Sequence, residues 1–130
     1  MPRIAPALAA IAATLIVVGG ASAHNARFDS TIEITDVEAH DGPPPEKFSG
    51  VVGSTRRACV RQRKVVLIYH YAGDRTVVAE DTSNRDGEWR IVYDAYGDYS
   101  AKVRRKRIVR SGHRHICRSA RTPSQSILPG

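Results

Sequence analysis

Cysteine is scarce in this chain of 130 residues, which contains only Cys59 and Cys117. The two lack the C-x-x-C spacing of a zinc or redox motif. A helical period is missing after the first 23 residues, which argues against a helix bundle. No nucleophile with an oriented base and no pair of facing carboxylates can be recognised. These absences argue against an enzyme that acts alone.

Acidic residues gather around one segment, where Asp81, Asp86 and Glu88 raise the question of calcium binding. The D-x-[DN]-x-[DN]-G loop and the distal glutamate of a calcium site are both missing. We therefore interpret these acids as turn residues, and no metal or other cofactor is predicted from them.

The first residues have the features of an export signal. Arg3 supplies a positive charge, an apolar run follows at residues 4–18, and small residues end at Ala23. This pattern predicts a signal peptide at residues 1–23 that is cleaved before His24. The alternative is a transmembrane anchor, but spanning a bilayer takes about 20 apolar residues, and this run is shorter. We expect a secreted or extracytoplasmic protein with no transmembrane anchor after cleavage.

The two cysteines form an even pair in a chain that we expect to be exported. Such pairs are usually oxidised outside the cytoplasm, so we predict a disulfide between Cys59 and Cys117. A bridge that closes so long a loop adds about 4 kcal/mol in the chain-entropy model. Free thiols and a two-cysteine metal site are the alternatives.

Polar and apolar residues alternate with period two after the leader, which is typical of strands in a sandwich or barrel. Seven strand segments are predicted, at residues 28–37, 47–52, 64–71, 76–80, 88–94, 98–104, and a last one made of 107–110 and 113–118. The last can also be read as two short strands joined by a turn at Ser111 and Gly112. Residues 64–71 are almost wholly apolar, so we place the core around this central strand.

The connections are predicted from proline, glycine and asparagine. Three prolines make residues 40–46 an extended connector. Residues 81–87 should join the fourth and fifth strands in a β-hairpin, and residues 96–98 should form a tight turn. The predicted fold is a single all-β sandwich of about seven strands at residues 24–121, followed at residues 122–130 by an edge strand near 126–128 or a flexible tail.

Several motifs are shared with known modules. They are Phe48, Gly50 and Val52, the apolar strand around Val66 and Ile68, the run Arg85-Asp86-Gly87-Glu88-Trp89, and Gly97, Tyr99, Ala101 and Val103. In this order they resemble the exported sandwich modules related to transthyretin and to the regulatory-like domain of carboxypeptidases. The resemblance implies a non-catalytic Greek-key sandwich. An immunoglobulin-type domain is the nearest competitor, but Trp89 lies too far beyond Cys59 for its core tryptophan.

Positive charge is concentrated near the end of the chain. Residues 101–130 hold nine basic residues and no acid, whereas residues 24–100 hold ten basic and thirteen acidic residues. We predict a basic stripe that binds an anionic cell-wall polymer or an acidic partner protein. Its residues are Arg104, Arg105, Lys106, Arg107, Arg110, Arg114 and Arg118. The alternative is a solubilising surface, and nucleic acid is not expected because no binding motif is recognised.

Histidine offers a second hypothesis. Cleavage after Ala23 would make His24 the amino terminus, where an α-amine and an imidazole can chelate copper. His113 and His115, spaced for one face of a strand, could complete such a site, as could His40 or His70. The leading interpretation is a secreted, non-enzymatic binding or structural module. An exported copper-binding protein and a subunit of a larger assembly are the alternatives, and the oligomeric state stays open.

Overall fold

The computed structural model describes residues 25–38, 46–93 and 96–127. The predicted signal peptide, His24 and the proline connector at 40–45 lie outside these residues. The described part of the chain contains no helix with the length and apolar character needed to cross a bilayer.

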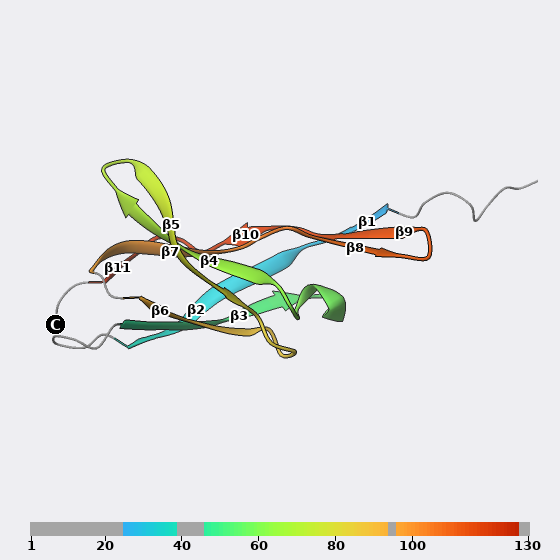
Figure 1. Cartoon of the computed structure of the whole chain (residues 1–130), viewed down its shortest axis with the longest axis horizontal. Coiled ribbons are helices and arrows are strands. Elements are labelled where there is room, and N and C mark those ends of the chain that lie inside the picture. The colour runs from blue at the N-terminus through green and yellow to red at the C-terminus, as the bar shows by residue number, and fades with distance from the viewer. Residues whose placement is uncertain (1–24, 39–45, 94–95, 128–130) are drawn as a thin grey trace, which may run out of the picture.

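Two antiparallel sheets face each other in the main body of the molecule (Figure 1). One sheet has the strand order β2-β3-β6, with bounds Ser30–Glu38, Glu46–Ser54 and Glu88–Tyr93. The other has the order β10-β7-β4-β5, with bounds Ala120–Arg121, Gly97–Val103, Lys64–Tyr71 and Asp74–Thr82. A further short strand, β11 (Gln125–Ile127), also pairs with β7. The predicted all-β sandwich is confirmed.

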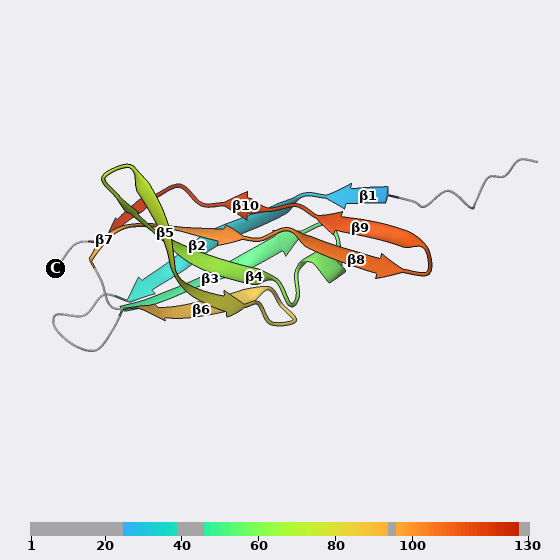
Figure 2. The same cartoon turned by 45° about the horizontal axis from the view of Figure 1, so that its top comes forward.

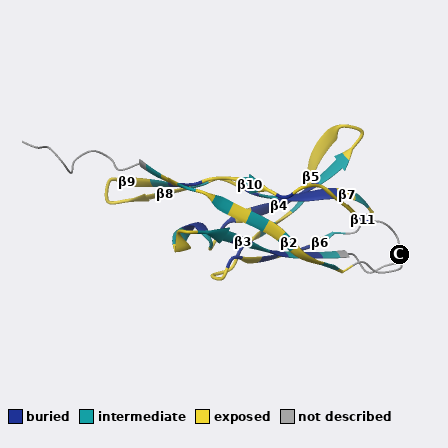
Figure 3. Ribbon diagram, turned by 180° about the vertical axis from the view of Figure 1, so that it is seen from behind, coloured by how far each residue is buried: buried dark blue, intermediate teal, exposed yellow. Residues whose placement is uncertain are grey.

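The core lies between these two sheets. The first sheet contributes Phe48, Val52, Trp89 and Ile91, and the second contributes Val65, Leu67, Tyr99, Ala101, Val103 and Ile127. Because side chains alternate along a strand, every second residue of each central strand enters this layer. β4 occupies the centre of its sheet and is buried on both faces from Val65 to Ile68, as its apolar sequence predicts. Figure 3 shows buried residues along much of β4 and β7 and along parts of β3 and β6 in the facing sheet.

A third sheet extends from one end of the sandwich. It consists of β1 (Asn25–Phe28), β9 (His113–Cys117) and β8 (Lys106–Arg110), in the order β1-β9-β8. β1 runs parallel to β9, and β8 runs antiparallel to it. Each strand adjoins a strand of the sandwich along the chain, β1 with β2, β8 with β7 and β9 with β10. We call this projection, visible in Figures 1 and 2, the arm.

The structure contains more strands than the seven predicted segments, because two of these segments break and two short strands, β10 and β11, follow them. The first divides at Asp29 into β1 and β2, and the last divides into β8 and β9. The second break is the predicted turn, where Ser111 (φ 46°) and Gly112 (φ 77°) adopt left-handed conformations. The expected edge strand near 126–128 is β11, whose Ile127 is buried in the core, so the sandwich continues past residue 121.

The predicted hairpin between residues 76–80 and 88–94 is wrong. β5 pairs with β4, and β6 pairs with β3 in the opposite sheet. The real hairpin turns at Ala72 (φ 51°) and Gly73 (φ 84°), a pair that gives the twist favoured between adjacent strands. β6 crosses over because pairing with β3 directs Trp89 and Ile91 into the core.

The tight turn predicted at residues 96–98 is also wrong, since Gly97 and Asp98 already belong to β7. β6 and β7 lie in different sheets and form no hairpin. The connections β3 to β4, β5 to β6 and β6 to β7 therefore all cross between sheets, which is a Greek-key arrangement.

Candidate functional site

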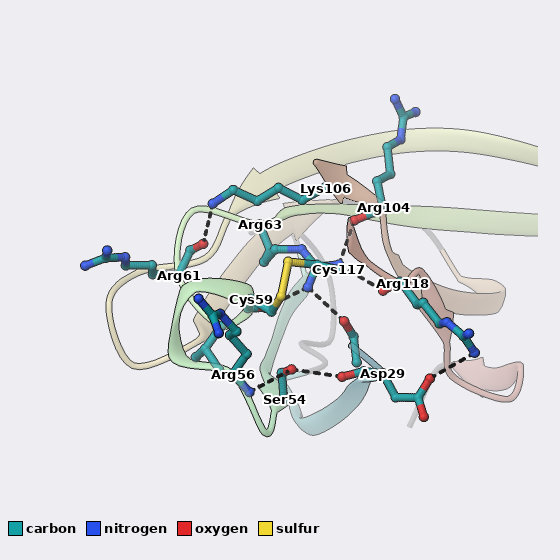
Figure 4. The surroundings of a disulfide bond; sticks show 12 residues. Asp29, Ser54, Arg56, Cys59, Arg61, Arg63, Arg104, Lys106, Cys117 and Arg118 are labelled. Atoms are coloured by element: carbon teal, nitrogen blue, oxygen red, sulfur yellow. Dashed lines mark hydrogen bonds and ion pairs between the residues drawn. A yellow bond between two sulfur atoms is a disulfide. The ribbon is translucent and has the colours of Figure 1, made fainter. Parts of the chain in front are cut away.

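The predicted disulfide lies at the base of the arm. Cys59 and Cys117 are bonded, with their Cα atoms 5.4 Å apart, and both are fully buried. Cys59 ends a short 3-10 helix, η1 (Arg57–Cys59), and Cys117 ends β9. The bridge therefore ties the loop between β3 and β4 to the arm at the point where the arm joins the sandwich (Figure 4).

A buried arginine occupies the same junction. The guanidinium of Arg63 donates to the carbonyl of Cys59 at 2.6 Å and to the hydroxyl of Ser30 at 2.9 Å. It also donates to the carbonyls of Arg104 at 2.8 Å and Arg118 at 3.0 Å. Ser30, Arg104 and Arg118 stand where the arm strands join the rest of the chain. One side chain thus binds residues that flank each of the three arm strands (Figure 4).

Arg63 has a structural role. Burial lowers the pKa of its guanidinium, because the charged form loses solvent there. Neutral carbonyl and hydroxyl oxygens accept its hydrogen bonds. Sequence reasoning missed this residue, because a charged side chain next to the exposed Lys64 gives no local sign of burial.

One face of the arm is rich in arginine. On β8 and β9, Arg107 and Arg114 share a face because strand residues alternate and Val109 is paired with Arg114. Arg27 on β1 is paired with Ile116 and lies on this face too. Arg27, Arg105 and Arg118 line a shallow cavity of about 420 Å³ with Ile116 and Ser119. We call Arg27, Arg105, Arg107, Arg114 and Arg118 the arginine face.

The arginine face contains little compensating negative charge. The three arm strands have the sequences NARF, KRIVR and HRHIC, without a single acid. Arg118 lies 3.3 Å from a carboxylate oxygen of Asp29. Because this ion pair is largely exposed to solvent, it compensates the charge of the Arg118 guanidinium only weakly. A ligand with several anionic groups would meet mostly unneutralised guanidinium groups here.

The opposite face of the arm carries two other predicted residues, Lys106 and Arg110. Lys106 donates to the carbonyl of Arg61 at 3.1 Å. Partial burial lowers the pKa of its ammonium, and the nearby charges of Arg63 and Arg61 lower it further. Arg110 lies on the same side as Lys106 and lines a cavity of about 280 Å³.

The seven residues of the predicted stripe are therefore not gathered on one face. Arg105, Arg107, Arg114 and Arg118 belong to the arginine face, while Lys106 and Arg110 lie on the other. Arg104 is exposed and points away from the disulfide in Figure 4, and its carbonyl binds Arg63. Sequence reasoning missed Arg27, because the parallel pairing of β1 with β9 joins residues far apart in the chain.

His113 and His115 lie on one face of β9, as expected from their spacing, with ring centroids 6.5 Å apart. No group of three or more potential metal ligands occurs among the described residues. His24 and His40 lie outside them, so the copper hypothesis stays a prediction.

His70 faces a different partner. A nitrogen of its ring is 2.7 Å from the hydroxyl oxygen of Ser100 on the neighbouring strand. A serine and a histidine at this distance resemble a nucleophile and its base, but Ser100 is only 1% exposed. A substrate cannot reach this hydroxyl, so the pair is part of the sheet's packing.

Two of the three clustered acids serve the connection between β5 and β6, as the sequence indicates. Asp81 accepts a hydrogen bond from the backbone of Arg90, and Glu88 accepts one from the side chain of Asn84. Asn84 itself accepts from the backbone nitrogens of Asp86 and Glu88, both at 2.9 Å. These contacts shape the turn.

No family model, curated protein or solved structure matches this chain. The resemblance to transthyretin-related modules therefore remains a prediction based on motifs that many sandwich domains need.

Proposed function

We propose that this chain is an exported, non-enzymatic binding module and that the arginine face of its arm binds an anionic polymer of the cell envelope or extracellular space. The observation that carries the proposal is the convergence of five arginines on one face of a sheet whose strands contain no acid. Export is supported by the buried disulfide, because such bonds persist in oxidising compartments.

A polymer suits this surface better than a small ligand. Alternate residues along a strand are about 6.6 Å apart and neighbouring strands about 4.8 Å, so the guanidinium groups form a broad array rather than a cluster. A single exposed ion pair contributes about 0–1 kcal/mol, so useful affinity requires several contacts at once. Arginine is the suitable cation, because its planar group forms paired hydrogen bonds with phosphate and carboxylate.

The scaffold supports such a role. Arg63 and the disulfide fix the base of the arm, so its strands are held in place before a ligand arrives, and little ordering entropy is lost on binding. A non-catalytic sandwich of the transthyretin-related type would use its sheets in this way, as a frame for a surface.

Binding to immobilised sodium polyphosphate and to purified cell wall tests the proposal. The double variant Arg107→Gln/Arg114→Gln should weaken binding about tenfold or more, and the wild type should lose affinity steeply as salt rises. The matched control is Arg75→Gln/Arg90→Gln, which removes two exposed arginines from the sandwich and changes the net charge equally. Equal losses in both variants, or binding that is insensitive to salt, would overturn the proposal.

A further inference from the structure

The face of the arm opposite the arginine face contains a second cavity. Its volume is about 280 Å³, and it lies between η1 with the residues before it and the hairpin of β8 and β9. Its lining residues are Arg56, Ala58, Ile108, Arg110, His113 and His115, with Ser111 at the turn. These residues come from two segments that are distant in the sequence and are brought together by the tertiary structure.

An aromatic contact positions one wall of this cavity. The guanidinium of Arg56 lies over the ring of Phe28, 5.1 Å from its centroid, and the backbone nitrogen of Arg56 donates to the hydroxyl of Ser54 at 3.2 Å. The Phe28 ring is 5.6 Å from the ring of His115. A guanidinium stacked on an aromatic ring keeps its charge while losing freedom of rotation. Phe28 thus sets Arg56 and His115 at the edge of the same cavity.

The disulfide sets the distance between the two walls. Cys59 directly follows Ala58, and Cys117 lies two residues beyond His115 on the same face of β9. The covalent bond therefore holds the η1 wall against the hairpin wall. This cavity is a fixed feature of the arm.

The chemistry of the lining selects a particular kind of ligand. Two guanidinium groups offer planar arrays of donors for an anion. No acid lines the cavity among the described residues. Ile108 and Ala58 supply an apolar surface between these polar groups. Ligand pockets range from about 300 to about 1,000 Å³, so this one suits a small molecule or one terminal group.

We propose that this cavity binds a small organic anion, a phosphate monoester or carboxylate whose charged head contacts Arg56 and Arg110 and whose apolar body lies on Ile108 and Ala58. The site is separate from the arginine face, because Arg110 and Arg107 lie on opposite faces of β8. It does not depend on the polymer-binding role of that face.

Isothermal titration with phenyl phosphate, inorganic phosphate and phenol tests this site on the full domain. Phenyl phosphate should bind at least about fivefold more tightly than either fragment, because only it uses both the arginines and the apolar surface. Arg110→Gln should weaken phenyl phosphate binding about fivefold or more. Arg75→Gln, a matched control that removes an exposed arginine from β5 of the sandwich, should change the affinity less than about twofold.

A second variant separates a loss of ligand binding from a loss of folding. Ala58→Leu retains every charge but places a larger side chain in the cavity, so it should weaken phenyl phosphate binding about fivefold or more while polyphosphate binding persists. Near-ultraviolet circular dichroism of Trp89 in the core checks that each variant is folded. Absence of phenyl phosphate binding, equal affinity for phenyl and inorganic phosphate, or equal losses in Arg75→Gln and Arg110→Gln would overturn this proposal. Failure of the arginine-face variants alone would leave it intact.

Discussion

The indole ring of Trp89 lies directly against Gly50, the residue paired with it on the neighbouring strand. A Cβ atom at position 50 would collide both with that ring and with the backbone carbonyl of Glu33. Because Gly50 has no side chain, it leaves room for the indole of the only tryptophan of the chain. Glycine at this position therefore lets β2, β3 and β6 come together above the core.

Replacing this glycine should destabilise the sandwich. We expect Gly50→Ala to lower the free energy of unfolding by about 2 kcal/mol or more, because neither the ring nor the Glu33 carbonyl can move without disturbing the sheet. Urea denaturation followed by Trp89 fluorescence measures the change. Ser49→Ala, which alters the adjacent residue on the other face of β3, is the control, and a similar loss there would contradict the explanation.

Arg63 should be essential for the arm. Arg63→Met removes the donor and leaves the buried carbonyl of Cys59 and the partly buried carbonyls of Arg104 and Arg118 without it, so we expect a loss of about 3 kcal/mol or more. Hydrogen exchange should show faster exchange in β1, β8 and β9 than in β4. Arg61→Met, the nearby exposed arginine, is the control. Unchanged protection of the arm in Arg63→Met would refute this role.

One substitution should stabilise the hairpin between β4 and β5. Ala72 adopts φ 51°, a left-handed conformation that costs an alanine about 1 kcal/mol and that asparagine tolerates better. We expect Ala72→Asn to raise the unfolding free energy by about 0.5–1 kcal/mol, measured from the urea midpoint. Thr76→Asn, on the extended part of β5, should have no such benefit. A gain at Thr76 as large as that at Ala72 would point to another cause.

Stability should respond to the ionisation of Lys106. Burial and the charges of Arg63 and Arg61 lower the pKa of this ammonium in the folded protein, so over an alkaline range the unfolded chain binds more protons. Stability contributed by Lys106 must then rise with pH until its ordinary pKa of 10.5 is reached. The free energy of unfolding of the wild type, relative to Lys106→Met, should increase over the alkaline range just below pH 10.5.

The control for this pH effect is Lys64→Met. The Lys64 ammonium lies 3.9 Å from the Glu80 carboxylate instead of beside two arginines. Urea titrations of both variants at each pH separate the Lys106 contribution from the titration of the remaining groups. A difference between the wild type and Lys106→Met that falls or stays constant as pH rises would contradict the assignment.

Local pattern was sufficient for much of the fold. Alternation of apolar and polar residues located the segments that became β2, β3 and β5 to β7, and the unbroken apolar run at 64–71 identified the central strand β4. The turn at Ser111 and Gly112 was readable because serine followed by glycine favours a tight reversal. Two cysteines in a chain with an export-like leader were enough to pair Cys59 with Cys117.

The partner of each strand, in contrast, was decided only by the tertiary structure. The segment Asn84 to Gly87 has the residues of a hairpin turn, yet β6 pairs with β3, because only that pairing buries Trp89 and Ile91 beneath the opposite sheet. Pairing of β1 with β9 likewise placed Arg27 on the arm, and the tertiary structure brought Arg56 and Arg110 to the same cavity. Alternation along a strand reports which residues share a face, but it carries no information about which strand lies next to it. The sequence by itself therefore determined most of the strands and the disulfide between Cys59 and Cys117. The packing of distant segments decided which arginines share a face of the arm.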